Sequence, residues 1–326
     1  MWERLDSEHK GGKATSNLIH TLGSKKKVPF LLLVIATALP LIMRNAYFLH
    51  MIILIMSWTV LAVSWNLLGG YTGQVSFGHA AFFGMGAYTA CLLHVKLGVS
   101  LWLGFIAAGI AGALISLPIG VICFRLKGPY FALSVLAFSE VLRLITLHWK
   151  SFTEGAVGIL LINPVLSSKR GYYYLILVIT VFTLMTVRSL LRKRMGYYFR
   201  TIREDEEAAE ALGIFSTRYK LLSLGVSAFF TGIMGSFFAN YTNYIDPYIV
   251  FSIGDVSIAM VLIVVLGGIG TFWGPLVGSV IVVLLSEGFR NIFASASLLI
   301  YGALIIVVIL FLPRGIVGHI MAGDRI

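Results

Sequence analysis

Four residues near the start of the sequence combine polar side chains with glycine inside an apolar stretch. Gln74, Ser76, Gly78 and His79 lie within six positions of one another. If the stretch is helical, Gln74 with Gly78 and Ser76 with His79 are neighbours on its surface. An ionisable group in hydrocarbon is costly unless it faces protein or water. Two interpretations are open: a path that replaces the water around a zwitterionic solute, or hydrogen bonding between packed helices.

A second group of residues, in the middle of the chain, is acidic and rich in alanine. Thr201 and Glu204 have capping-box spacing, which predicts a helix that begins at Thr201, and Gly213 is a typical residue to end it. Such a helix has about 11 residues and a length of roughly 16 Å. The small side chains of Ala208 and Ala209 permit close approach of another surface. We predict a docking helix, with a solvated connector as the alternative.

Three more ionisable residues lie in or near apolar runs. Glu140 and Arg143 are three residues apart and therefore share a helical face, which predicts an ion pair. Glu287 falls near the end of a later run, where its side chain can reach water. In another interpretation Glu140, Glu287 and His79 are the ion sites of a transporter driven by an ion gradient.

The sequence also lacks the patterns of several other chemistries. It has no G-x-x-x-x-G-K-[ST] phosphate loop, and its seven histidines are scattered without the spacing of metal ligands. Cys91 and Cys123 lie inside apolar runs and indicate no disulfide framework. We therefore expect no catalytic residue, no metal site, no cofactor bound by this chain and no ATPase activity of its own.

The elements that position these residues are predicted to be membrane-spanning helices. Of the 326 residues, 58% are hydrophobic and 12% charged, and the mean hydropathy is +0.92, which excludes an ordinary soluble domain. A span needs about 20 apolar residues, so the predicted fold class is all-α, a polytopic transmembrane bundle of about ten spans. The predicted spans are 28–43, 48–68, 75–95, 101–124, 130–148, 172–190, 221–239, 254–273, 275–290 and 297–312.

Positive charges predict which ends of the spans face the cytoplasm. With a cytoplasmic N-terminus, 18 Lys and Arg residues fall on the cytoplasmic side: six in residues 1–27, two in 125–127, eight in 188–220 and two near the C-terminus. Six fall on the other side. This bias follows the positive-inside rule and places both termini in the cytoplasm. A re-entrant helix in the glycine-rich run 75–95 would change that parity. Because the charges flank apolar runs and form no basic face, we expect no nucleic-acid partner.

The domain organisation follows from these runs. We expect a basic cytoplasmic N-terminal segment over residues 1–27, a transmembrane domain over 28–318 with a cytoplasmic loop at 191–220, and a cytoplasmic tail over 319–326. Within the transmembrane domain, the Leu-Gly-Gly sequence of residues 68–70 is echoed at 266–268. That echo is too short to establish a duplicated fold.

Several of these motifs together resemble a known transporter family. Glu207-Ala208-Ala209 followed by Gly213 matches the core of the EAA loop of ABC importer permeases, without the usual Ile-x-Leu-Pro continuation. Longer stretches resemble the LivM-type permease of branched-chain amino acid ABC transporters. They are NLLGGYTGQVSFGHAAFFGMGAYTA (66–90), GPYFALSVLAFSE (128–140), TIREDEEAAEALGI (201–214), LGGIGTFWGPLVGS (266–279) and LFLPRGIVG (310–318).

The resemblance implies the pore-forming half of an importer in the bacterial cytoplasmic (inner) membrane, in contact with membrane lipid. It implies four partners: two cytoplasmic ATP-binding subunits that use ATP and Mg, a second homologous permease subunit, and a soluble extracytoplasmic protein that delivers Leu, Ile or Val. Glu207, Ala208, Ala209 and Gly213 then couple the chain to the ATPases. Glu140 stands where Gln is common in the family, and related permeases that carry urea, amides or aromatic acids remain alternatives.

Overall fold

A computed structural model describes residues 36–40, 45–162, 165–166, 168–290, 315–317 and 319. The chain divides between Leu49 and His50 into two units, and the second unit contains the elements discussed below apart from the first residues of α3. Its helices are α3 (Ala46–Asn66), the π-helix η1 (Leu67–Tyr71), α4 (His79–Leu97), α5 (Leu101–Cys123), α6 (Pro129–His148), α7 (Lys150–Thr153), the 3₁₀ helix η2 (Gly155–Val157), α8 (Lys169–Arg192), α9 (Arg194–Glu204), α10 (Glu206–Ala211), α11 (Ser216–Thr242), α12 (Pro247–Val250), the π-helix η3 (Ile253–Ile258), α13 (Ala259–Gly267) and α14 (Gly274–Arg290).

Seven helical segments in the described residues are long and apolar enough to cross a membrane, which confirms the all-α transmembrane fold class. They correspond to the predicted spans from 48–68 to 254–273. They are Ala46–Tyr71, His79–Leu97, Leu101–Cys123, Pro129–His148, Lys169–Arg192, Ser216–Thr242 and Pro247–Gly267. The ninth predicted span is the shorter helix α14. Two predicted spans lie outside the described part of the chain. They are 297–312 and 28–43, of which only residues 36–40 are described, as helix.

The glycine-rich run 75–95 differs from its prediction at its first turn. Residues 72–78 form no helix, and α4 begins only at His79 and continues unbroken to Leu97. Gly73 has a φ of +77°, a conformation that glycine adopts without the penalty of a Cβ atom. The break therefore precedes the span, and α4 itself is long enough to cross the membrane without re-entry.

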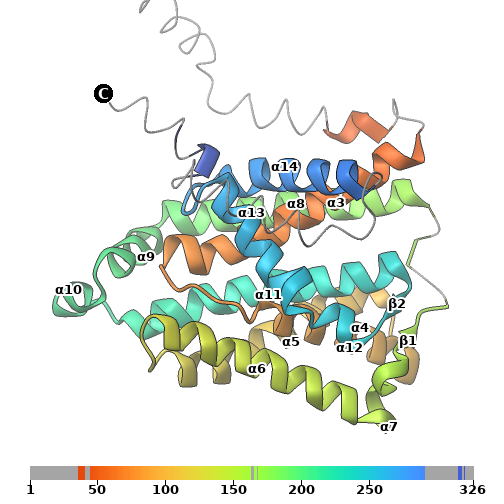
Figure 1. The fold of residues 1–326 in the computed structure, drawn as a ribbon, viewed down its shortest axis with the longest axis horizontal. Helices are drawn as coiled ribbons and strands as arrows, with labels where there is room; N and C mark the ends of the chain where they lie inside the picture. Colours follow the sequence, from red (N-terminus) through yellow and green to blue (C-terminus); the bar gives the residue numbers. More distant parts are fainter. Residues whose placement is uncertain are drawn as a thin grey trace, which may run out of the picture. The chain divides into compact units, whose positions relative to one another are not determined.

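The loops of the second unit gather at two opposite ends. At one end, the segment between α5 and α6 contacts α10, where Lys127 Nζ lies 2.8 Å from Glu207 Oε1. At the other end, β1 (Ile159–Leu160) pairs antiparallel with β2 (Tyr244–Ile245). Figure 1 shows α9 and α10 at the left edge, and α7, β1 and β2 at the right. The described spans thus alternate in direction as the predicted parity requires.

The core of the unit is formed by α11 packed against α4 and α5. Small residues bring these helices into backbone contact. A Cβ atom on Gly86 would lie 2.2 Å from the Gly232 carbonyl oxygen, and one on Gly235 would lie 2.0 Å from the Phe83 carbonyl oxygen. Close backbone approach of this kind is how membrane helices gain van der Waals packing without a hydrophobic driving force.

The outer surface of α5 and α6 is apolar. Large side chains there are exposed in the single chain, as expected for helices that face lipid or a second membrane subunit. They include Leu103, Ile106, Ile110, Leu114 and Leu117 on α5, and Leu133, Val141, Leu144 and Ile145 on α6.

Candidate coupling helix and candidate solute path

The acidic segment forms two helices where the sequence predicted one. Thr201 lies inside α9, where its Oγ1 donates a hydrogen bond to the Tyr197 carbonyl, so the predicted start at Thr201 is wrong. The chain is extended at Asp205, whose carboxylate accepts hydrogen bonds from the amides of Glu207 (2.9 Å) and Ala208 (3.0 Å). A short acidic side chain competes in this way with helical hydrogen bonding. The resulting α10 has six residues.

The predicted end of this helix at Gly213 is confirmed. Gly213 has a φ of +82°, and its amide donates to the Glu210 carbonyl at 2.9 Å. The Ile214 amide donates to the Ala209 carbonyl at 3.0 Å. These two bonds form a Schellman motif, in which glycine is favoured because the residue must be left-handed.

Two faces of α10 have different surroundings. Ala209 is fully buried against its own chain, so its small side chain serves internal packing. Glu207, Ala208 and Gly213 are exposed. Leu212 and Phe215 are 77% and 74% exposed. We call Glu207, Ala208, Leu212, Gly213 and Phe215 the docking surface.

Polar contacts hold α10 against the start of α11. Lys220 Nζ lies 2.5 Å from Glu206 Oε2, with side chains only 4% and 27% exposed. Ser216 Oγ donates to the Glu210 carboxylate. Lys220 could not be predicted as a partner of Glu206, because 14 residues separate the two and no local spacing indicates their contact.

A second ion pair of α10, between Glu207 and Lys127, is solvent-exposed. Its side chains are 79% and 74% exposed, and the hydrogen bond that Lys127 donates to the Glu207 carboxylate raises the pKa of Lys127. Exposed pairs of this kind contribute little to stability. Glu207 therefore remains available to another protein, whereas Glu206 does not.

The four candidate path residues lie at the break before α4. Ser76, Gly78 and His79 are buried and Gln74 is half-buried. Both ring nitrogens of His79 have partners: Nδ1 lies 3.2 Å from Ser76 Oγ and Nε2 lies 2.8 Å from Ser227 Oγ on α11. The structure thus brings His79 and Ser76 together in a network between helices, which is the arrangement that the packing interpretation predicts.

Gly78 is in close contact with α6. A Cβ atom there would lie 2.3 Å from Val135 Cγ1 and 2.5 Å from the Val135 carbonyl oxygen. A larger residue at position 78 would therefore displace α6, so a loss of transport in such a variant would report on packing as much as on a solute path.

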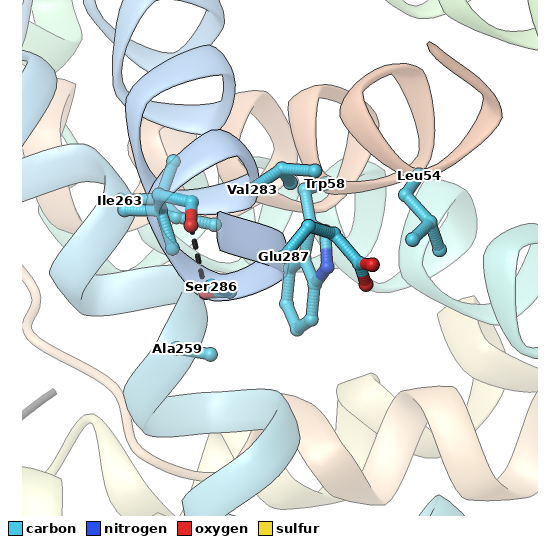
Figure 2. A pocket seen from close by; sticks show the side chains of 8 residues that line it. Leu54, Trp58, Ala259, Ile263, Val283, Ser286 and Glu287 are labelled. Carbon is cyan, nitrogen blue, oxygen red and sulfur yellow. Dashed lines mark hydrogen bonds between the residues drawn. The ribbon is translucent and has the colours of Figure 1, made fainter. Parts of the chain in front are cut away.

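The remaining ionisable candidates lie elsewhere. Glu140 and Arg143 form the predicted ion pair on α6, with Arg143 Nε 2.9 Å from Glu140 Oε2. Glu287 lines a cavity of about 120 Å³ together with Trp58, Leu54 and Ile263. Figure 2 shows Glu287 and Trp58 extending into it. Within the described residues no three His, Cys, Asp or Glu side chains lie close enough to hold a metal ion.

Comparison with known proteins gives one consistent result. Residues 47–309 match the family model described as branched-chain amino acid transport system / permease component. The chain is 30% identical over 314 residues to the high-affinity branched-chain amino acid transport system permease protein LivM of Salmonella typhimurium, an alignment that covers 87% of this chain and 73% of the relative. It is 29% identical to the LivM protein of Escherichia coli, with the same coverage. No solved structure matches.

Proposed function

Since this chain belongs to the branched-chain amino acid transport permease family, we propose that it forms the translocation path of an ATP-driven importer of Leu, Ile and Val. As a permease it is a transport subunit without an ATPase domain. In this proposal two cytoplasmic subunits supply ATP hydrolysis with Mg, a second homologous permease completes the path, and an extracytoplasmic binding protein delivers the amino acid. The end that carries α9 and α10 then faces the cytoplasm, as do both termini.

The docking surface is the observation that carries the proposal. Two large apolar side chains, Leu212 and Phe215, are exposed next to a short helix that its own chain holds by Glu206 and Ala209. Such exposure at a loop end outside the described spans is typical of an interaction site. Full burial of a leucine side chain stabilises a complex by about 1.5–3 kcal/mol, which corresponds to an affinity change of about 10- to 100-fold.

Replacement of one exposed leucine tests the docking role. We expect Leu212→Asp to weaken co-purification of the ATPase subunits by at least about tenfold, because it removes apolar area and introduces a charge. Val157→Asp is the matched control: Val157 is 79% exposed but lies at the opposite end, so its variant is expected to assemble normally. Normal assembly of the Leu212 variant would overturn the docking assignment.

Uptake measurements test the energy source and the substrate. In vesicles with internal ATP, uptake of radiolabelled leucine is expected to persist when the proton gradient is collapsed. Loss of uptake under that condition would favour the transporter driven by an ion gradient, with Glu140, Glu287 and His79 as ion sites. Isoleucine and valine are expected to compete with leucine. Competition by urea, short amides or aromatic acids instead would assign the chain to one of those substrate classes.

A further inference from the structure

The first Leu-Gly-Gly segment meets the loop that follows the second one, at the end of the unit that carries α9. Asn66, the last residue of α3, joins them: its Nδ2 donates to the Thr271 carbonyl, and its Oδ1 accepts from the Gly270 amide, both at 2.9 Å. Asn66 is 2% exposed. The end of α3 and the loop after α13, 204 residues apart, are therefore fixed together by one amide. We call residues 66–73 and 267–271 the glycine junction.

Arg203 connects α9 to this junction. Its Nη1 donates to the Gly70 carbonyl at 2.7 Å, within the π-helix η1 that ends the first described span. The last carbonyls of a helix have no partner inside the helix, and a positive charge is favourable at that end of the dipole. The guanidinium thus satisfies an acceptor that α3 cannot satisfy itself.

The glycines of the junction are required by this contact. A Cβ atom on Gly270 would lie 2.3 Å from Arg203 Nη1. One on Gly70 would lie 1.9 Å from Asn66 Oδ1 and 2.7 Å from the Gly270 amide nitrogen. Gly70 and Gly270 therefore leave room for each other, and Gly270 leaves room for the arginine.

Arg203 is also one residue before the end of α9, and only Asp205 separates α9 from α10. Only two residues, Glu204 and Asp205, therefore link Arg203 to α10, so a displacement of α10 by a partner reaches Arg203 through them. We propose that Arg203 is the positioning residue that transmits this displacement to the ends of α3 and α13 together, so that the two spans move as one. This inference rests on the proposed function, because it presupposes an ATPase that displaces α10.

The test measures assembly, ATP hydrolysis and transport separately in the complete transporter, reconstituted in liposomes and supplied with radiolabelled leucine. Arg203→Gln is expected to leave co-purification of the ATPases and ATP hydrolysis within about twofold, and to lower leucine uptake at least tenfold. Arg203→Lys is expected to recover part of the uptake, because an ammonium group can still donate to the Gly70 carbonyl. Arg194→Gln, a change at an exposed side chain at the start of the same helix α9, is the matched control and is expected to behave as wild type.

A second variant tests the contact from the other side. Gly270→Ala would place a Cβ atom against the guanidinium and would also strain the backbone, because Gly270 has a φ of +73°. Adding Arg203→Gln to Gly270→Ala is therefore expected to cause no further loss of uptake, since residues acting through one contact are not additive. Normal uptake per ATP in Arg203→Gln would overturn the inference, and so would loss of assembly in that variant, which would assign Arg203 to docking. If the wild-type chain fails to assemble with any ATPase, the proposed function itself is wrong.

Discussion

The buried ion pair between Glu206 and Lys220 allows a quantitative test of how α10 is held. Lys220 has a side chain only 4% exposed, and its nearest other favourable contact is the Phe124 ring, 5.8 Å from Nζ. Loss of one partner of a buried pair costs about 3–5 kcal/mol, because the remaining charge is left uncompensated. The ring offsets about 1 kcal/mol of this cost. We therefore expect Glu206→Ala to destabilise the chain by about 2–4 kcal/mol.

Two further variants separate the ion pair from other effects. Lys220→Met leaves Glu206, which is 27% exposed and can recover hydration, so its cost is expected to be less than half that of Glu206→Ala. Glu207→Ala removes an acidic residue from the same helical turn and the same end of the helix dipole. Because the Glu207 pair is exposed, its removal is expected to leave stability unchanged.

Thermal unfolding of the purified chain in detergent measures these differences. Cys91 and Cys123 are both fully buried. A thiol-reactive fluorophore therefore reacts with them only when the core unfolds, and no cysteine has to be introduced. At about 2–4 °C per kcal/mol, Glu206→Ala is expected to lower the Tm by about 4–16 °C. Equal Tm values for Glu206→Ala and Glu207→Ala would refute the reasoning, since only the burial of the Lys220 partner distinguishes the two variants.

Three other predictions follow from contacts in the described residues. His79→Ala should lower stability by about 1–3 kcal/mol without changing the apparent affinity for leucine, and an unchanged Tm would contradict the packing role of His79. Asn66→Asp should cost about 2 kcal/mol in the same unfolding assay, because a carboxylate cannot donate to the Thr271 carbonyl, and wild-type stability would contradict the shared amide. A cysteine at Leu212 should react with membrane-impermeant thiol reagents only from the cytoplasmic side and one at Val157 only from the opposite side; labelling of both from one side would contradict the topology.

Local sequence features were sufficient to predict the described spans of this fold. Apolar runs predicted the seven described spans, because hydrocarbon thickness fixes the length of a spanning helix. The Glu140 and Arg143 pair and the end of α10 at Gly213 were also predicted, since each depends on residues within one helical turn. The wrong start at Thr201 has a local cause as well. Thr201 and Asp205 are both residue types that can begin a helix, and the sequence does not show which of the two does so.

Contacts between distant segments could not be predicted in the same way. Ala209 was interpreted as an exposed docking residue, and the structure buries it, because a run of alanines does not indicate which face packs. Arg203 and Gly70 are 133 residues apart, and their contact depends on where α9 lies relative to α3. Such a contact becomes visible only when the spans are placed against one another.

The short length of α10 bears on how it can act. A six-residue helix is far below the length at which a helix is stable alone in water, so α10 depends on its attachments to two buried residues of α11, Lys220 and Ser216. If these attachments were loose, a partner pressing on Leu212 would unfold the helix and no displacement would reach the spans. Because they are buried, the helix and the start of α11 must move together. The same contacts that stabilise α10 therefore make it a stiff element, and the exposed face is left free for recognition.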